Sequence, residues 1–596
     1  MRNLSKSKIL AFRQCPKRLW LEIHKPELRD DSGSETAFAI GFQVGDVARK
    51  IHDPEGRGVT VDIGELGHGA ALALSATLLA EGDGPVFEAG VTIPGALAYA
   101  DVMLPDRSEG SLRWRMVEVK ASTGVKDYQR DDLAVQVFIA TSSGVPLASA
   151  ALALIDNSFV YPGGGDYRGL LYEVDLTEEC LSRADEVKGW IEGASVTAEL
   201  DDEPQQTTGP HCGSPFECPY GAYCRGQQPG EPPVVYPLSS LPRLGGWRRE
   251  AIVNEGFRDL REVPDELLTG VQQRVRECSV TGVPYFDAPG AAADLADCGS
   301  PCCFLDFETI GFAVPVWKGT RPYQQIPFQF SVHRIGEDGG LGHVPFLDLT
   351  GNDPSCSAAD DLVAACGDRG PVFVYNAKFE RRILRELAQR VPDRAKALLA
   401  ITDRIVDLEP IARRRYYHPG QHGSWSLKAV LPALCPDLSY GDLDGVKDGG
   451  MAQAAYQEAV APAATPEDKH RLARQLLDYC HLDTLALVRM WEVFAGVLAA
   501  CRIREGGDPV TSSTPRRIGT VCCARPGCSR FCIFPASYQR STAHNSVFSI
   551  LQCRAAEAMG NRHGKPNRWH IGNPTSDLQI GHLDTPCQAC LLHCLL

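Results

Sequence analysis

Polar and apolar residues alternate in the short stretch 116–120, and this pattern predicts a β-strand. Successive side chains of a strand point to opposite faces, so Glu118 and Lys120 share one face with Met116, whereas the two valines between them face the other way. A carboxylate and an ammonium group therefore lie side by side on an otherwise apolar element. Burying either charge alone is costly, so this pair needs a metal ion, a phosphate or each other as a partner.

Helices and strands are predicted on both sides of this element. A helix opened by a serine cap is expected over residues 4–24, with a break at Pro16, and a second helix is expected over residues 35–51. From about Val59 through Glu118 the pattern predicts a region of alternating strands. The chain therefore begins as a mixed α/β protein.

Two further polar groups are expected near the strand pair. An upstream apolar strand carries Asp101 as its single acid, and a helix over residues 128–141 lays Gln136 beside the strand acids. Asp101, Glu118 and Lys120 together form the D…E-x-K pattern of a metal-dependent phosphodiesterase site.

Three cysteines, Cys212, Cys218 and Cys224, follow one another at six-residue steps among glycines and prolines. This spacing is typical of a loop that wraps its thiolates around one centre. A fourth ligand is missing locally, and Cys15, which also precedes a proline, is the obvious supplier. Four thiolates complete either an iron–sulfur cluster or tetrahedral zinc. The alternative is three unrelated buried thiols.

Acids recur further along the chain at strand and helix spacing. Asp306 and Glu308 lie two apart in an apolar strand, so both carboxylates face the same way and repel each other unless a cation holds them. A later strand, residues 371–376, leads into a helix that carries Glu380. A long helical run then places Tyr479 and Asp483 on one helix face.

Residues 1–226 resemble the RecB-type PD-(D/E)xK nucleases that carry an iron–sulfur cluster, such as the fourth type of CRISPR-associated protein. The resemblance rests on the order of the features: one cysteine in a basic N-terminal helix, an acid in a Gly…Asp strand, Glu-Val-Lys, a Gln helix and three clustered cysteines. It implies a restriction-endonuclease-like fold in which Asp101 and Glu118 bind a divalent metal. Lys120 would orient or activate the attacking water.

The same resemblance implies a structural role for the cysteines. The ligands of a 4Fe–4S cluster that clamps the two ends of this domain together would be Cys15, Cys212, Cys218 and Cys224. Gln136 falls where the family has Gln-x-x-x-Tyr, but Ala140 stands in place of the tyrosine.

The later acids resemble those of DEDD-type 3′–5′ exonucleases, which have an RNase H-like fold and hold two metal ions on four acids. Residues 304–309, 322–333 and 479–484 look still more like an uncharacterised bacterial domain family that commonly follows the iron–sulfur nuclease. The metal ligands implied by this resemblance are Asp306, Glu308 and Asp483. Tyr479 would position water. The third of the four acids is either Glu380, where exonucleases usually have Asp, or Asp407.

Composition narrows the class of protein. A formal net charge of −15 argues against general attraction to nucleic acid, so binding must be local, and the basic residues among the first 30 are one candidate surface. Twenty-two cysteines without a secretory signal indicate reduced thiols and metal or cluster ligands. No stretch approaches the roughly 18 uninterrupted apolar residues that a membrane span requires. We therefore expect a cytoplasmic protein that does not enter a membrane.

Four segments are predicted. They are an iron–sulfur nuclease domain over residues 1–226, a linker with a small helical insert over 227–295, an RNase H-like exonuclease-type domain over 296–500, and a Cys-rich basic tail over 501–596. A zinc site in the tail could use Cys528, Cys532, Cys587 and Cys590. The weak periodicity there favours a poorly ordered extension instead.

These patterns predict a metal-dependent nuclease that hydrolyses phosphodiester bonds in DNA rather than RNA, as an exonuclease on single-stranded ends. Mg²⁺ or Mn²⁺ is the expected catalytic ion. One alternative is a nucleic-acid-binding repair or defence adaptor with vestigial nuclease sites. A second is an RNA exonuclease that acts through the later domain, and a third is a non-catalytic scaffold whose cysteines bind zinc.

Overall fold

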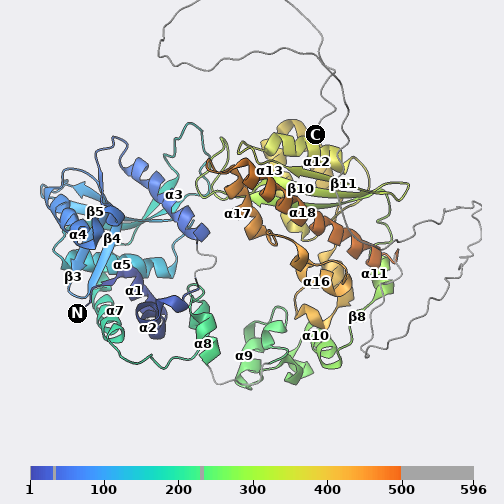
Figure 1. Ribbon diagram of the computed structural model, residues 1–596, viewed down its shortest axis with the longest axis horizontal. Coiled ribbons are helices and arrows are strands. Elements are labelled where there is room, and N and C mark those ends of the chain that lie inside the picture. The colour runs from blue at the N-terminus through green and yellow to red at the C-terminus, as the bar shows by residue number, and fades with distance from the viewer. Residues whose placement is uncertain (1, 31–34, 228–233, 498–596) are drawn as a thin grey trace, which may run out of the picture. The chain divides into compact units, whose positions relative to one another are not determined.

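The structure is a computed structural model that describes residues 2–30, 35–227 and 234–497 (Figure 1). These residues fall within one compact unit, Met1–Pro509, which contains a seven-stranded and a five-stranded sheet. The chain is thus mixed α/β, as predicted. The expected Cys-rich tail lies outside the described residues, so its zinc site or disorder stays a prediction.

The first sheet has the strand order β2-β3-β4-β5-β6-β7, and β1 pairs with β4. Its strands are β1 Leu4–Ser5, β2 Val59–Thr60, β3 Val86–Ile93, β4 Ala96–Asp106, β5 Arg113–Lys120, β6 Leu147–Ile155 and β7 Leu171–Asp175. Strands β3, β4 and β5 are antiparallel, β5 and β6 are parallel, and β7 is antiparallel to β6. Val102 of β4 lies opposite Val117 of β5, and this register brings Asp101 next to Glu118.

Helices cover this sheet. They are α1 Lys6–Gln14, α2 Pro16–His24, α3 Glu35–His52, α4 Ile63–Glu81, α5 Asp127–Ser142, α6 Thr177–Ser182, α7 Ala184–Ala198 and α8 Gly221–Gln227. The predicted break at Pro16 is confirmed, because Cys15 has extended backbone between α1 and α2. The helices expected over residues 35–51 and 128–141 are confirmed as α3 and α5. In α5, Leu133 and Val137 pack into the core under the sheet.

The prediction of alternating strands from about Val59 through Glu118 is wrong over Ile63–Glu81, where the chain forms α4. The side chain of Asp62 caps the first turn, and Gly82 ends the helix in the left-handed conformation that favours glycine. This segment consists largely of alanine and leucine, which have high helix propensity. That propensity and the two end signals outweigh the apparent alternation.

Among the described helices, α4 is long and apolar enough to cross a membrane, with a mean hydropathy of 1.3 over its 18-residue window. Ala71 and Leu79 of α4 are buried in the core that the helix shares with β3. A single helix of this kind is weak evidence for a membrane span. The cytoplasmic location stays a prediction.

The second sheet has the strand order β11-β10-β9-β12-β13. Its strands are β9 Cys302–Ile310, β10 Ile326–Ile335, β11 Leu341–Leu347, β12 Val372–Val374 and β13 Ile405–Asp407. Strands β9, β10 and β11 are antiparallel, whereas β12 and β13 continue the sheet in parallel with β9. The strands expected over residues 304–309 and 371–376 are confirmed as β9 and β12. Two short strands, β8 Tyr285–Phe286 and β14 Tyr416–Tyr417, pair separately.

The helices of this part are α9 Gly246–Asn254, α10 Gly270–Thr281, α11 Ala288–Asp294, α12 Ser355–Cys366, α13 Ala377–Arg390, α14 Ala395–Asp403, α15 Glu409–Arg415, α16 Leu427–Leu434, α17 Gly449–Val460 and α18 Pro466–Phe494. Helices α9 and α10 lie within residues 227–295, where a small helical insert is expected. Helix α18 is 29 residues long and packs across β9, β10 and β11 (Figure 1). It buries Leu476, Leu487 and Trp491 in the core. Its Thr484 contacts polar side chains of β10.

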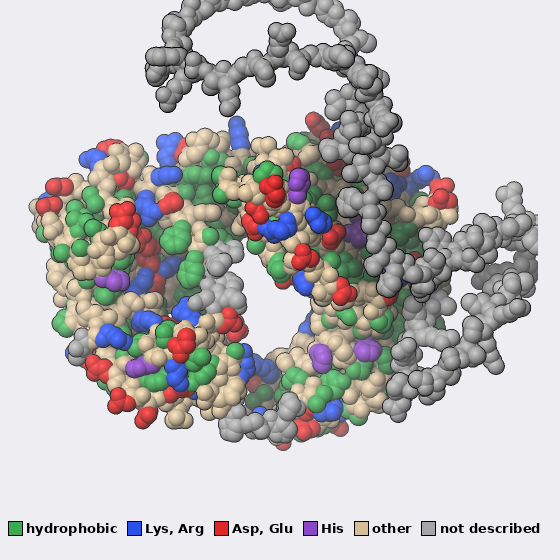
Figure 2. All heavy atoms as spheres, viewed as in Figure 1, with side chains coloured by type: hydrophobic (Ala, Val, Ile, Leu, Met, Phe, Trp, Pro, Cys, Tyr) green, Lys and Arg blue, Asp and Glu red, His purple; other side chains and the backbone are tan. Residues whose placement is uncertain are grey.

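Charged side chains of both signs intermingle on the face shown in Figure 2. This mixture agrees with the acidic net charge and with the expectation that any binding to phosphate is local.

Candidate metal centres

The first cluster of charged side chains lies where β4 and β5 meet α5. Lys120 Nζ donates a hydrogen bond to Glu118 Oε1 at 2.8 Å and also pairs with Asp132 of α5. Asp101 Oδ2 accepts a hydrogen bond of 2.7 Å from the backbone N–H of Val119. The two paired strands thus bring together the three residues of the D…E-x-K pattern.

Lys6, the first residue of α1, completes this cluster. Its Nζ donates to Glu118 Oε1 at 2.8 Å and lies 3.0 Å from Asp132 Oδ1. Two ammonium groups therefore contact one carboxylate that is only 2% exposed. The sequence shows Lys6 only as one of several basic residues near the start of the chain, and the pairing of β1 with β4 is what anchors α1 at the site.

The charges in this first cluster have opposite effects on its two acids. Burial, together with the negative charge of Glu118, raises the pKa of Asp101 to about 8. Burial also acts to raise the pKa of Glu118, but the charges and hydrogen bonds of Lys120 and Lys6 outweigh it and lower that pKa. At neutral pH Glu118 is therefore ionised, whereas Asp101 is largely protonated unless another cation approaches it.

Four buried polar atoms at this site have no hydrogen-bond partner among the described residues. They are Glu118 Oε2, Asp132 Oδ1, which still forms an ion pair with Lys6, and the two amide atoms, Oε1 and Nε2, of Gln136. Gln136 is fully buried on α5. An unsatisfied buried polar group costs about 1–3 kcal/mol, so these atoms suit a site that takes a further polar ligand. The acids fit a divalent cation: Glu118 Oε2 is free to bind it, and its charge would favour the ionised form of Asp101.

The four cysteines predicted to share one centre line a single small cavity. Its lining includes Cys15, Cys212, Cys218 and Cys224, together with Lys17 and Arg18. All four cysteines are free thiols. Cys15 lies between α1 and α2, whereas the other three belong to the segment that ends in α8, so the cavity joins the two ends of the first predicted domain.

The second cluster of acids lies between β9 and α18. Asp306 and Glu308 extend from β9 and Asp483 extends from α18, and one carboxylate oxygen of each lies within 4.8 Å of the others. Burial and the charge of Asp483 raise the pKa of Asp306 well above its usual range and that of Glu308 to about 8. Burial raises the pKa of Asp483 to about 6. Three mutually repelling buried acids are a donor set that fits a divalent cation.

Glu380 and Asp407, the two alternatives for the remaining acid, have different surroundings. Glu380 is 2% exposed in the first turn of α13, its Oε2 has no hydrogen-bond partner among the described residues, and burial raises its pKa to about 8. Its charge also contributes to the raised pKa of Asp306. Asp407 instead accepts three backbone hydrogen bonds, at 2.9–3.1 Å, from the start of α13 and of α15. Glu380 is therefore the better placed of the two to bind a cation.

Two tyrosines hydrogen-bond to Asp483. One is the predicted Tyr479, one turn earlier on α18, and the other is Tyr440, whose hydroxyl donates to Asp483 Oδ1. Lys428 Nζ lies 5.6 Å from the ring centre of Tyr440 and 5.4 Å from that of Tyr479. The sequence did not reveal Tyr440 or Lys428, because each lies on a separate element that reaches the acids only in the folded chain.

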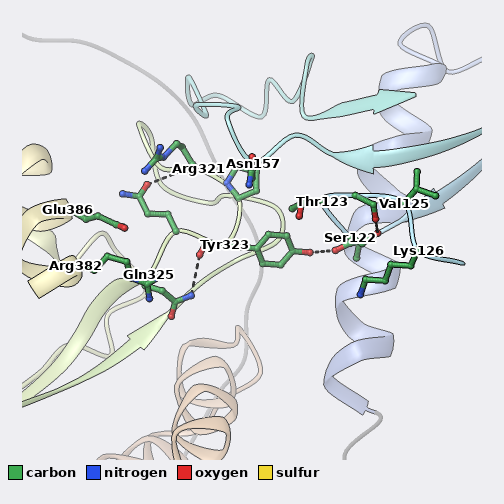
Figure 3. A pocket seen from close by; sticks show the side chains of 14 residues that line it. Ser122, Thr123, Val125, Lys126, Asn157, Arg321, Tyr323, Gln325, Arg382 and Glu386 are labelled. Carbon is green, nitrogen blue, oxygen red and sulfur yellow. Dashed lines mark hydrogen bonds between the residues drawn. The ribbon is translucent and has the colours of Figure 1, made fainter. Parts of the chain in front are cut away.

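A cavity of about 810 Å³ lies between the segment that follows β5 and helix α13 (Figure 3). Residues 121–126, which directly follow Lys120, line one side, and Arg382 of α13, two positions after Glu380, lines the other. Lys126 and Arg321 add positive charge to the wall. The Tyr323 hydroxyl donates to the Ala121 carbonyl and so ties the two walls together.

The fold and these sites define a mixed α/β protein with two acid-lined centres suited to cations and one cysteine-lined cavity. Residues 303–426 match the family model of a domain of unknown function (DUF2779). The match includes β9 and Glu380 and ends before α18. No curated protein matches the chain.

Proposed function

We propose that this protein is a metal-dependent nuclease that hydrolyses phosphodiester bonds in DNA. The observation that carries the proposal is the convergence of Asp101, Glu118 and Lys120 at one buried site with unsatisfied polar atoms. The arrangement of β3 to β6 is consistent with a PD-(D/E)xK domain. A PD-(D/E)xK assignment accounts for the acid, the Glu-x-Lys pair and the Gln helix together.

Each residue of the first site has a role in this proposal. Mg²⁺ or Mn²⁺ held by Asp101 and Glu118 would supply an activated water and neutralise charge on the scissile phosphate. Lys120 is fixed between Glu118 and Asp132, so its ammonium group is already oriented to stabilise negative charge that develops on the phosphate. Lys6 supplies a second positive charge at 2.8 Å from the same carboxylate.

The later region is proposed to be an RNase H-like, exonuclease-type domain. Its sheet, three antiparallel strands continued by two parallel strands, supports this fold. Asp306, Glu308 and Asp483 would hold the cations, with Glu380 as the fourth acid. Tyr479 would position water beside Asp483, to which it is hydrogen-bonded.

A structural 4Fe–4S cluster is proposed for the cysteine cavity, with Cys15, Cys212, Cys218 and Cys224 as its ligands. The four cysteines line one small cavity, which supports a shared metal centre, and the resemblance to the iron–sulfur nucleases favours a 4Fe–4S cluster over zinc. Anaerobically purified protein should be brown. A colourless protein that holds one zinc ion at these cysteines would contradict this assignment.

DNA in the cytoplasm is the proposed substrate, approached as a single strand. The cavity of about 810 Å³ between the segment after β5 and helix α13 carries Lys126, Arg321 and Arg382, which could contact the phosphates of a strand. Binding by such a wall should weaken as salt concentration rises.

The test compares nucleotide release from end-labelled single-stranded DNA by four proteins: wild type, Lys120→Ala, Asp306→Asn and the double variant. With Mg²⁺ or Mn²⁺ present, Lys120→Ala should reduce release by about 10²–10³-fold, because a fixed positive charge at the phosphate is lost. Lys188→Ala is the matched control, since Lys188 is an exposed lysine on α7. Equal release by wild type and Lys120→Ala would defeat the assignment to the first site.

One observation favours a second candidate, a nucleic-acid-binding adaptor with vestigial sites. Lys6 and Lys120 already neutralise Glu118, so this carboxylate is partnered without a metal. Binding of DNA without cleavage under any divalent cation would support the adaptor. Loss of RNA hydrolysis in Asp306→Asn alone would instead indicate an RNA exonuclease that acts through the later domain.

A further inference from the structure

Three histidines converge on the sheet face that α18 covers, apart from both acid clusters. His333 of β10 lies directly opposite His343 of β11, and His481 extends from α18 toward both. One ring nitrogen of each lies within 4.8 Å of the others. The ring centres are 4.4–4.8 Å apart. His333 is 2% exposed, and the other two are half-buried.

Two hydroxyl groups determine which nitrogens of this trio remain available. His333 Nδ1 lies 2.8 Å from Thr484 Oγ1, and His343 Nε2 lies 2.8 Å from Ser331 Oγ. The Thr484 hydroxyl donates to the carbonyl of Cys480 on its own helix and lies 2.6 Å from Ser331 Oγ. In one consistent assignment, Ser331 donates to Thr484 and each hydroxyl accepts from one imidazole N–H. His333 Nε2 and His343 Nδ1 are then left as lone-pair donors.

The separation of two of these nitrogens matches that of metal ligands. His343 Nδ1 and His481 Nδ1 are 3.3 Å apart. Nitrogens bound to one tetrahedral zinc ion at Zn–N distances of about 2.0–2.1 Å are separated by about 3.3 Å. Burial and the neighbouring histidines lower the pKa of His333 to about 3, so its ring is neutral and can act as a ligand.

We propose that His333, His343 and His481 form a transition-metal site, with zinc as the favoured ion. Imidazole nitrogens suit zinc and other late first-row ions, whereas Mg²⁺ prefers the oxygen donors of the acid clusters. Ser331 and Thr484 do not bind the metal but hydrogen-bond to the ligating histidines and so orient their rings, an arrangement typical of protein zinc sites. Three protein ligands leave a fourth position for water. The site does not depend on the proposed nuclease activity.

Cobalt substitution tests the site directly. Co²⁺ in a tetrahedral nitrogen site absorbs strongly in the visible, six-coordinate Co²⁺ on carboxylates absorbs weakly, and Co²⁺ on thiolates adds intense near-ultraviolet bands. After alkylation of the thiols, titration of the full chain with Co²⁺ should therefore reveal one strongly absorbing site without thiolate bands. Zn²⁺ should displace it.

Variants locate the signal. His343→Ala should abolish the visible band, and Ser331→Ala should weaken Co²⁺ affinity by about 10–100-fold, because it removes a hydrogen bond that orients a ligating histidine. His470→Ala, which changes an exposed histidine on the same helix, is the matched control and should leave the band unchanged. Thermal unfolding checks that each variant is folded. If His343→Ala does not fold, His481→Asn is used in its place.

Two outcomes would overturn the proposal. One is a wild-type protein that binds Co²⁺ only with the weak absorption of carboxylate sites. The other is a visible band of the alkylated protein that persists when the trio is changed, in folded His343→Ala or in its replacement. In either case the 3.3 Å contact is a hydrogen bond between two imidazoles.

Discussion

The two acidic clusters differ in how the negative charge of their buried carboxylates is compensated. In the first, Glu118 contacts two ammonium groups at 2.8 Å, so most of its charge is balanced by the chain itself. In the second, Asp306, Glu308 and Asp483 face one another. The charge of Lys428 partly opposes the rise in the pKa values of Glu308 and Asp483 that burial causes. Side chains thus balance the charge of the first site, whereas the acids of the second have no such close partner and would gain more from a bound cation. The predictions below test this contrast.

The largest expected effect comes from removing the charge of Glu118. Glu118→Gln removes the most buried carboxylate that Lys6 and Lys120 share and leaves them with Asp132, and breaking a buried pair costs at most about 3–5 kcal/mol. Asp306→Asn should instead leave the free energy of unfolding unchanged or raise it, because it relieves repulsion. Urea unfolding of both variants in EDTA measures the difference. Equal destabilisation by the two would refute the contrast.

The next effect is stabilisation by metal. At a free Mn²⁺ concentration of 100 times the Kd, binding adds about 2.7 kcal/mol to the free energy of unfolding. We expect the gain to fall sharply in Asp306→Asn and much less in Asp101→Asn, because the second cluster has the greater need for a cation. Thermal melts with and without Mn²⁺ give the two gains, and a larger loss in Asp101→Asn would reverse the ranking.

A pH dependence follows from the raised pKa values of the second cluster. Glu308 and Glu380 have pKa values of about 8 in the folded protein, above those of unfolded glutamate. The folded state therefore binds more protons, and the stability of metal-free protein falls as pH rises from about 4.5 to about 8. Glu380→Gln should flatten this slope. Urea midpoints measured across this pH range provide the check, and an unchanged slope would count against a raised pKa for Glu380.

The smallest effect concerns Tyr440. Tyr440→Phe removes one hydrogen bond to a buried carboxylate, which is worth about 1.5–3 kcal/mol when the acceptor is charged and about 1 kcal/mol when it is neutral. Since the pKa of Asp483 is about 6, the loss should be smaller at pH 5 than at pH 8. A loss that does not change with pH would show that the carboxyl does not titrate in this range.

Local patterns in the sequence predicted the elements that carry most of the site residues. The alternation around Glu118 and the two-residue spacing of Asp306 and Glu308 appear in the structure as strands with those side chains on one face. The proline that follows Cys15 likewise indicated this residue as the fourth member of the cavity. In each case the signal lies within a few residues or in a chemically distinctive residue type.

What the sequence did not reveal depends on long-range packing. Lys6 reaches Glu118 across 112 positions of the chain, and nothing in its own neighbourhood distinguishes it from the other early basic residues. Asp407 accepts backbone hydrogen bonds at the start of both α13 and α15, and this role cannot be inferred from sequence because α13 begins about 30 residues earlier in the chain. The histidine trio comes from two strands and a helix, of which only the helix had been predicted, so no local pattern could connect its members.

Helix α18 directs Tyr479 and Asp483 to one centre and His481 to another. Because these residues are at most four positions apart, sliding the helix by a single turn, about 5.4 Å, would dismantle both centres together. A metal ion bound at the acid cluster would hold α18 in place and so keep His481 in position at the histidine trio. Because such coupling is reciprocal, each centre should bind its ion more tightly when the other centre is occupied. The two centres are thus expected to assemble, and to come apart, as one cooperative unit.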